Sequence, residues 1–229
     1  MSKDPEVSIV MSVYNGEKYL KNSIESILDQ TYKDFEFLII DDCSSDKSAD
    51  ILKEYQALDR RIKLFFNREN KGLTTNLNFL IRKSKGEYIV RMDADDISFK
   101  ERVEKQLHFF SKHHEIDVLG SSAIDIDENG KIIRYRSVPT SDQDIKKMIL
   151  KLSPIIHPTV MFKKKSLEKI NFYNEKYRTS QDLDMWFRAM SIGLKFHNLE
   201  EPLLYYRYES NYKKKRNLGF RINDFKIRI

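Results

Sequence analysis

The sequence contains little cysteine or glycine. Cys43 is the only cysteine among 229 residues, so the chain can form neither an internal disulfide nor a multi-cysteine metal site, in agreement with a reducing compartment. Its seven glycines include no dinucleotide-binding fingerprint and no P-loop. A chain without a glycine-rich cradle needs a cation to neutralise any phosphate that it binds.

Long hydrophobic runs are absent as well. No apolar stretch approaches the roughly 18 residues that a membrane-spanning helix requires. Residues 1–4 also lack the charged and apolar regions of a signal peptide. We therefore expect a cytoplasmic protein.

The net charge of +6 is confined to the end of the chain. Residues 207–229 contain eight basic and two acidic side chains, so residues 1–206 are neutral overall. The same stretch carries several apolar side chains, which suits an anionic membrane surface; a solvated terminal segment accounts for it equally well. We do not expect nucleic-acid binding, because no recognition motif accompanies the basic residues.

Short apolar runs alternate with amphipathic stretches in the first half of the chain, as is typical of an α/β domain with a mostly parallel sheet. We predict strands at 7–13, 35–40, 61–66 and 87–92, and helices at 16–30, from 44 or 45 through 55, and at 74–83. Further on we predict a helix at 99–113, a hairpin within 123–135, a strand at 158–162, a helix at 182–192 and a strand at 203–206. The expected organisation is one domain over 1–206 and a basic tail over 207–229.

Each of the first four predicted strands ends in a polar loop. In an open sheet of this kind, ligands bind where loops leave the carboxyl ends of the strands. The four loops are Tyr14–Gly16, Asp41–Ser44, Asn67–Gly72 and Asp93–Asp96. We expect them to converge on one edge of the sheet.

The run Asp93-Ala94-Asp95-Asp96 is the strongest chemical signal. Three carboxylates within four residues repel one another unless a cation or hydrogen-bond donors compensate. Mg²⁺ or Mn²⁺ commonly binds one or two protein carboxylates and completes its shell with substrate phosphates and water. An acidic turn that caps the following helix is the competing interpretation, and the motif alone does not decide between them.

Other polar residues have two interpretations each. Asp41 and Asp42 lie beside the metal candidate, where a carboxylate accepts hydrogen bonds from uracil or ribose, whereas Asp46 fits a helix cap. Asp182 is either a general base or a partner of a helix dipole. His157 is either an acceptor contact or a polar residue of a turn.

The ordered set of motifs resembles glycosyltransferase family 2, whose members have the GT-A fold. The similarity covers roughly residues 6–208, and several motifs in order are far more specific than any one of them. The matching segments are Val7–Gly16, Ser26–Tyr32, Ile40–Asp42, Asn70–Leu73, Lys85–Ile89, Met92–Ile97, His157–Phe162 and Asp182–Arg188. The resemblance implies a nucleotide-sugar-binding half over 1–98 and an acceptor and catalytic half over 99–206.

The resemblance also implies roles for individual residues. Ser12, Tyr14 and Asp42 would hold the uracil and nucleoside, Asp93 the ribose, and Asp95 a divalent Mn or Mg ion. Asp182 occupies the position of the catalytic base, although the preceding residue is Gln181 where the family usually has Glu. Asn15, Glu17, Asp41 and Asn76 are assigned to the donor side as well, and His157 and Gln181 to the acceptor side.

The implied reaction is an inverting, metal-dependent transfer of a hexose or N-acetylhexosamine from a UDP-sugar to a hydroxyl of a glycan or lipid-linked acceptor. Such a step belongs to cell-surface polysaccharide or lipo-oligosaccharide biosynthesis, at the inner face of the membrane. A sugar nucleotidyltransferase is an alternative, but residues 14–17 lack the glycine-rich basic loop of such enzymes. A non-catalytic nucleotide-sugar-binding scaffold is the other. The catalytic assignment requires Asp95 and Asp182 to flank one cavity.

Overall fold

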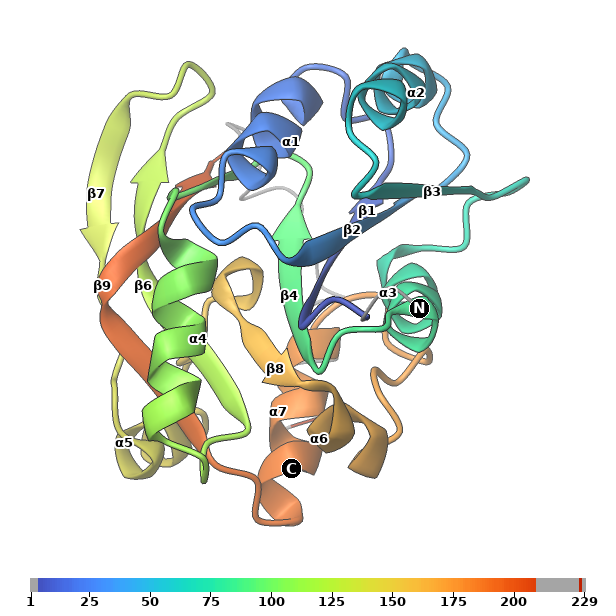
Figure 1. Cartoon of the computed structure of the whole chain (residues 1–229). Helices are drawn as coiled ribbons and strands as arrows, with labels where there is room; N and C mark the ends of the chain where they lie inside the picture. Colours follow the sequence, from blue (N-terminus) through green and yellow to red (C-terminus); the bar gives the residue numbers. More distant parts are fainter. Residues whose placement is uncertain (1–3, 209–226, 228–229) are drawn as a thin grey trace.

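The computed structural model describes residues 4–208 and residue 227 (Figure 1). The first half of the chain alternates strands and helices as predicted. Its elements are β1 (Val7–Val13), α1 (Leu20–Leu28), β2 (Phe35–Asp41), α2 (Ser48–Leu58), β3 (Ile62–Phe66), α3 (Leu73–Lys83) and β4 (Tyr88–Asp93).

The second half is less regular. It contains β5 (Ile97–Ser98), α4 (Arg102–Lys112), β6 (Val118–Ile126), β7 (Ile132–Arg136), α5 (Asp142–Met148), the 3₁₀ helix η1 (His157–Thr159), β8 (Met161–Lys163), α6 (Lys164–Lys169), α7 (Gln181–Ser191) and β9 (Phe196–Arg207). The hairpin predicted within 123–135 is confirmed as β6 and β7, whose turn contains Gly130 at φ 85°.

All nine strands of the described chain form one sheet. Its order is β3-β2-β1-β4-β8-β6-β9-β5, and β7 pairs with β6. Strands β3, β2, β1 and β4 are parallel, and β8 joins β4 in the antiparallel direction. The register places Asp93 opposite Ser12 and Asp41 opposite Val13, so the predicted site residues of three strands end at one edge.

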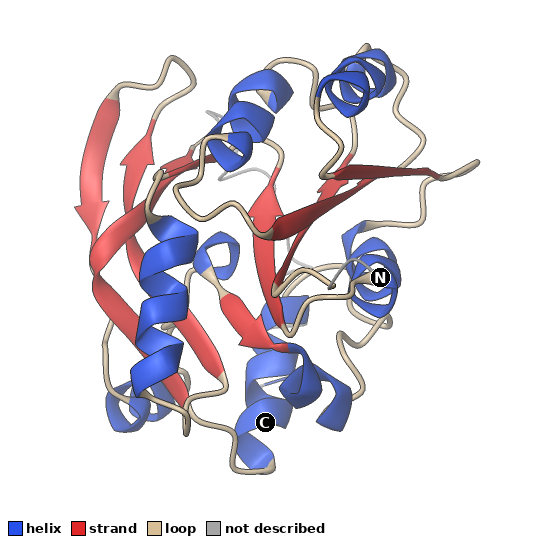
Figure 2. Cartoon of the chain, in the orientation of Figure 1, coloured by secondary structure: helices blue, strands red, loops and turns tan. Residues whose placement is uncertain are grey.

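Helices cover both faces of the sheet (Figure 2). On one face, alternate residues of β1 such as Ile9 and Met11 pack with side chains of α1, α2 and α4. On the other face, Val10 packs in a cluster with side chains of α3 and α7, including Leu77 and Trp186. This confirms an α/β fold with helices flanking a central sheet whose first half is parallel.

Several boundaries differ from the predictions for local reasons. The helix expected from residue 16 begins at Leu20, because the chain at Asn15 has φ 50° and its N–H bonds to Ser44 Oγ at 2.9 Å. Because this contact occupies the Ser44 hydroxyl, Ser44 does not cap the helix, and α2 begins at Ser48. The strand expected at 203–206 is the end of a longer strand, β9.

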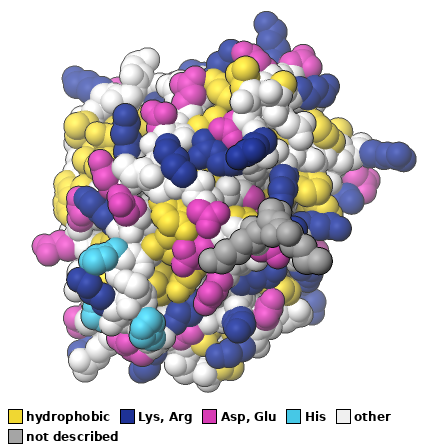
Figure 3. Space-filling model, viewed as in Figure 1, with side chains coloured by type: hydrophobic (Ala, Val, Ile, Leu, Met, Phe, Trp, Pro, Cys, Tyr) yellow, Lys and Arg dark blue, Asp and Glu magenta, His cyan; other side chains and the backbone are white. Residues whose placement is uncertain are grey.

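The boundary of the basic tail is one residue later than predicted. Arg207 is the last residue of β9 and is only 5% exposed, so it belongs to the sheet. Of the remaining tail, Tyr208 and Ile227 lie within the described residues; Ile227 is half-buried and packs against the cluster that contains Trp186. Over the face of the molecule in Figure 3, Lys and Arg side chains are interspersed with Asp and Glu, in keeping with the neutrality of residues 1–206.

None of the helices in the described part of the chain combines the length and the apolar character needed to cross a bilayer.

Candidate active site

A pocket of about 560 Å³ opens at the carboxyl ends of β1 and β4. Five of the predicted donor residues line it: Ser12, Tyr14, Asn15, Asp93 and Asp95. Its other lining residues are Gly16, Lys18, Tyr19, Leu73 and Ala94. The location agrees with the rule that ligands of an open α/β sheet bind at the carboxyl ends of the strands.

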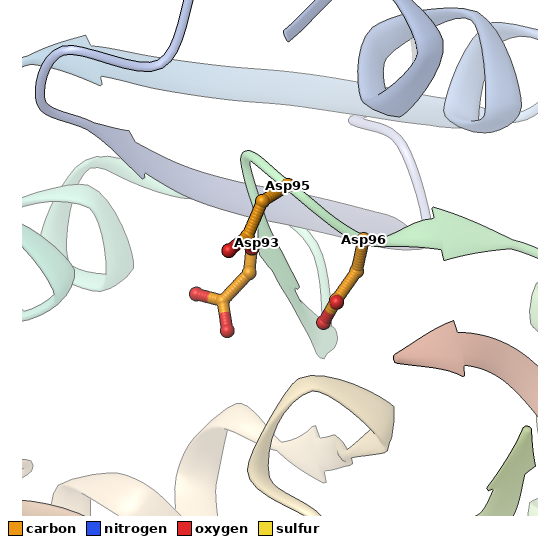
Figure 4. A group of neighbouring side chains, drawn as sticks. All are labelled: Asp93, Asp95 and Asp96. Atoms are coloured by element: carbon orange, nitrogen blue, oxygen red, sulfur yellow. The ribbon is translucent and has the colours of Figure 1, made fainter. Parts of the chain in front are cut away.

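The three carboxylates after β4 lie close together (Figure 4). One oxygen from each of Asp93, Asp95 and Asp96 lies within 4.8 Å of the others. Asp96 is buried; one of its oxygens accepts the Arg207 N–H at 2.8 Å, and the other has no hydrogen-bond partner among the described residues. Burial and the charges of Asp95 and Asp93 raise the pKa of Asp96 well above its usual range. A set of hard oxygen ligands with one orphaned buried oxygen fits a divalent cation.

Arg207 connects the acidic turn, Asp93–Asp96, to the rest of the site. Its guanidinium donates to the Asp95 carbonyl oxygen at 2.8 Å and to the Asp127 carbonyl oxygen at 3.0 Å. The same group lies 4.3 Å from the centre of the Tyr19 ring, which lines the pocket. The acidic turn, the β6–β7 turn and the pocket wall are therefore held by one side chain.

Asp42 holds the loop at residues 67–72 in place next to the site. It is 1% exposed, and its carboxylate accepts hydrogen bonds from Asn67 Nδ2 and from the Lys71 and Gly72 N–H groups at 2.7–2.8 Å. Burial opposes ionisation, but these donors outweigh it and lower the pKa of Asp42. Both oxygens thus hold the 67–72 loop, and Asp42 does not line the pocket.

Asn76 extends the same network to the pocket. Its side-chain oxygen accepts from Asn67, and its Nδ2 donates to Ser12 Oγ at 2.9 Å. Among the other predicted donor residues that do not line the pocket, Glu17 accepts the Lys47 N–H at 2.9 Å and Asp41 accepts the Ser44 N–H at 3.1 Å. The Glu17 contact ties the loops after β1 and β2 together, whereas the Asp41 contact lies within the loop after β2.

Asp182 lies in the first turn of α7, directly after Gln181. Its charge reaches the Tyr173 hydroxyl, which bonds to His157 Nε2 at 2.7 Å. Burial and the charges of Asp182 and Asp93 raise the pKa of Tyr173, against the opposing charge of Arg91. The charges of the candidate base and of the first carboxylate of the acidic turn therefore both act on the Tyr173 hydroxyl. That Asp182 and Asp95 flank one cavity stays a prediction.

The neighbours of Asp182 have structural roles. Trp186 is fully buried and stacks on Phe162, so it belongs to the core and is no sugar platform. Asp184 pairs with Arg188 at 2.7 Å, and Arg188 also donates to the Phe172 carbonyl oxygen. Burial and the charge of Arg91 lower the pKa of His157 well below its usual value, so its imidazole is neutral at pH 7.

Sequence reasoning missed three residues of this region: Arg91, Tyr173 and Arg207. Arg91 precedes Asp93 by two residues on β4, and its side chain is 4% exposed and pairs with the Asp93 carboxylate. The two-residue period of a strand is a signal that could have found it. No local pattern marks Tyr173 or Arg207, because their partners lie far away in the sequence.

Comparisons with known proteins agree with this geometry. The family model described as glycosyl transferase family 2 matches residues 8–171. An uncharacterized glycosyltransferase of Methanocaldococcus jannaschii is 43% identical over 206 residues, covering 89% of this chain and 71% of the relative. The O-antigen biosynthesis glycosyltransferase WbnJ of Escherichia coli is 35% identical over 219 residues, covering 93% of this chain and 84% of the relative.

Solved structures share the fold. The structure of Staphylococcus aureus TarS residues 1–349 with UDP-GlcNAc has a TM-score of 0.79 at 21% identity and covers 97% of this chain. This chain spans 64% of that TarS chain. The mannosyltransferase PcManGT of Pyrobaculum calidifontis, in complex with GDP-Man and Mn²⁺, has a TM-score of 0.64 at 17% identity, covering 88% of this chain and 56% of that one. With the family match and both relatives above 30% identity, the chain belongs to glycosyl transferase family 2 and is a glycosyltransferase with the GT-A fold.

Proposed function

We propose that this chain transfers a sugar from a nucleotide-sugar to a hydroxyl of a glycan or lipid-linked acceptor, with inversion at the anomeric carbon. A UDP-sugar is the first candidate for the donor. The observation that carries the proposal is the position of Asp93 and Asp95 on the wall of the 560 Å³ pocket, which Ser12 of β1 and Tyr14 directly after β1 also line. The relative named for O-antigen biosynthesis supports a polysaccharide acceptor, and the TarS structure with UDP-GlcNAc supports a UDP donor.

The acidic turn would hold a divalent cation through Asp95, with Asp93 and Asp96 beside it. A bound Mn²⁺ or Mg²⁺ supplies the positive charge that a departing nucleoside diphosphate needs. Ser12 and Tyr14 line the same pocket and would orient the nucleoside. Asn76 and Asp42 hold Ser12 and the 67–72 loop in place behind it.

Asp182 would act on the acceptor. Its carboxylate accepts the proton of the acceptor hydroxyl while that oxygen attacks the anomeric carbon from the face opposite the nucleotide. The carbon–oxygen bond to the diphosphate breaks as the new glycosidic bond forms, so the configuration inverts. Gln181 directly precedes this base and His157 bonds to Tyr173, and both side chains would contact the acceptor.

The decisive experiment separates donor binding from transfer. Nucleotide-sugars are screened with purified protein and Mn²⁺ for hydrolysis or thermal stabilisation, and UDP release is then measured with candidate acceptors. Asp95→Asn should lose metal-dependent nucleotide binding. Asp182→Asn should bind donor within about twofold of wild type and lose transfer by roughly 100-fold or more.

Asp50→Asn is the matched control, because Asp50 is exposed in the first turn of α2 and does not line the pocket. An aspartate that serves only the helix dipole would behave like Asp50, with a small loss of stability and normal transfer. Near-normal transfer by Asp182→Asn would therefore reject it as the base. Release of pyrophosphate from a nucleoside triphosphate and a sugar 1-phosphate, with no UDP released from a nucleotide-sugar, would point to a nucleotidyltransferase.

The basic segment 210–229 would place the enzyme at an anionic membrane surface, where lipid-linked acceptors reside. Except for Ile227, this segment lies outside the described residues. Deletion of 210–229 should weaken binding to vesicles that contain anionic lipid and leave the thermal midpoint of the domain within a few degrees. Unchanged partitioning of the deletion variant between buffer and vesicles would rule out this docking role.

A further inference from the structure

Arg91 is a buried cation directly beneath the acidic turn. It lies on β4 two residues before Asp93, and its Nη2 contacts Asp93 Oδ1. The side chain is only 4% exposed, and its Nε and Nη1 have no hydrogen-bond partner among the described residues. The carboxylate of Asp93 is therefore the acceptor that the structure gives to this buried guanidinium.

The surroundings of Arg91 include both sides of the site. Its charge acts on Asp96 on the donor side and on His157 and Tyr173 on the acceptor side. Its main chain is also fixed, since the Arg91 N–H donates to the Val160 carbonyl oxygen at 3.1 Å, next to η1. The charge of Arg91 thus acts both on the acidic turn and on the residues next to the predicted base.

A buried guanidinium suits a fixed position better than an ammonium does. Arginine stays charged at all ordinary pH values, and here its Nη2 holds one oxygen of the Asp93 carboxylate. Three clustered carboxylates repel one another, and one permanent cation beneath them offsets part of that repulsion. A lysine in the same place would lose its proton more readily on burial, and its shorter side chain would not place a nitrogen where Nη2 lies.

We propose that Arg91 is a positioning residue for the donor: it fixes the orientation of the Asp93 carboxylate, and through Asp93 it sets the affinity of the site for a nucleoside diphosphate. The inference rests on the proposed function, in which Asp93 contacts the nucleotide. Arg91 itself does not line the pocket and acts only through its neighbour.

The test is the dissociation constant of UDP with Mn²⁺, measured by titration calorimetry on the full chain. Arg91→Lys should weaken UDP binding about 10- to 100-fold, the range expected for loss of a charge-assisted hydrogen bond. Arg102→Lys is the matched control. Arg102 is equally buried, but its guanidinium donates to the carbonyl oxygens of Arg91 and Val160, and none of its described hydrogen bonds goes to the acidic turn.

A double-mutant cycle with Asp93→Asn separates positioning from general packing. If Arg91 acts through Asp93, the double variant should bind UDP no more weakly than Asp93→Asn alone. Additive losses, or equal affinities of Arg91→Lys and wild type, would overturn the inference. Failure of wild type itself to bind UDP, GDP or any other nucleoside diphosphate would instead reject the proposed function.

A second measurement applies if Arg91→Lys does not fold. Asp93→Asn removes the counter-charge of a buried cation, so its thermal midpoint should fall by roughly 10 °C. Asp95→Asn leaves that pair intact and should melt within a few degrees of wild type. Equal melting of the two variants would show that Asp93 is not the partner on which buried Arg91 depends, and the inference would fail.

Discussion

The Nε–H of Arg207 donates to the carbonyl oxygen of Asp95 at 2.8 Å, although 112 residues separate them in the sequence. This contact joins the last residue of β9 to the turn that carries the predicted metal ligand. The Arg207 N–H also bonds to the Asp96 carboxylate, so main chain and side chain act on the same turn. The position of the acidic turn therefore depends on β9 as well as on β4.

Replacement of Arg207 by methionine should loosen the acidic turn without removing any carboxylate. We expect the Mn²⁺ concentration for half-maximal activity to rise about 10-fold, in line with the loss of the one charge-assisted hydrogen bond from the Arg207 side chain to the Asp95 carbonyl oxygen. Arg134→Met is the control. Arg134 pairs with Asp125 within the β6–β7 hairpin, and none of its described hydrogen bonds goes to the acidic turn. The prediction fails if both variants need the same Mn²⁺ concentration as wild type.

The contrast between Ser12 and Arg207 shows what the sequence could predict. Ser12 and Asp93 end neighbouring parallel strands, and strand ends follow from local hydrophobic runs and the polar loops after them. Arg207 reaches Asp95 only because β9 lies between β6 and β5, a pairing that no local pattern encodes. Strand β9 was also hard to recognise, because it contains Glu200, Glu201 and Pro202, and its register shifts near Pro202.

Asp42 shows what a motif leaves open, and its contact with the nucleoside stays a prediction. The resemblance correctly placed Asp42 at the carboxyl edge of β2 and next to the site. Its two oxygens, however, accept three hydrogen bonds from the 67–72 loop, a segment that is distant in the sequence. Which carboxylate contacts ligand and which supports a loop depends on these tertiary donors, so it could not be read from the residue type.

The ionised form of Asp42 should stabilise the fold in a pH-dependent way. Because its pKa is lower in the folded chain than in the unfolded chain, the stabilisation is complete above the unfolded value of about 3.9 and is lost as the pH falls through the folded value. Asp42→Asn should therefore lower the unfolding free energy by about 2 kcal/mol at pH 7 and by much less near pH 2. Urea unfolding at both pH values measures this. A loss of unfolding free energy that is equal at pH 7 and pH 2 would contradict the prediction. Asp50→Asn, at an exposed position, gives the pH dependence expected from an aspartate without these contacts.

Gly86 should tolerate no side chain. A Cβ at this position would lie 2.5 Å from the Ser8 nitrogen and 2.6 Å from the Val7 carbonyl carbon, both in the backbone of β1. Gly86→Ala should lower the unfolding free energy by about 3 kcal/mol, since the strand next to the pocket has to move. Gly193→Ala is the comparison: φ is +83° and no atom lies within 4 Å, so only backbone strain of about 1 kcal/mol is expected. Equal thermal midpoints of Gly86→Ala and Gly193→Ala would show that β1 moves without a loss of stability.

Lys18 should contribute to donor affinity more than to turnover. Among the residues that line the pocket in the described part of the chain, it is the one cation, and its Nζ lies 3.2 Å from Glu128 Oε2 on the β6–β7 turn. Both side chains are exposed, so their ion pair is weak and a diphosphate can compete for the ammonium. Lys18→Met should raise KM for the donor about three- to tenfold and leave kcat within about twofold, whereas Glu128→Gln should lower KM slightly by releasing Lys18. Initial rates at varied donor concentration test both variants. If Lys18→Met lowers kcat and leaves KM unchanged, Lys18 acts in the transition state and not in donor binding. Salt gives a second check: KM of the wild type should rise with salt more steeply than KM of Lys18→Met, and equal slopes would contradict a role in donor binding.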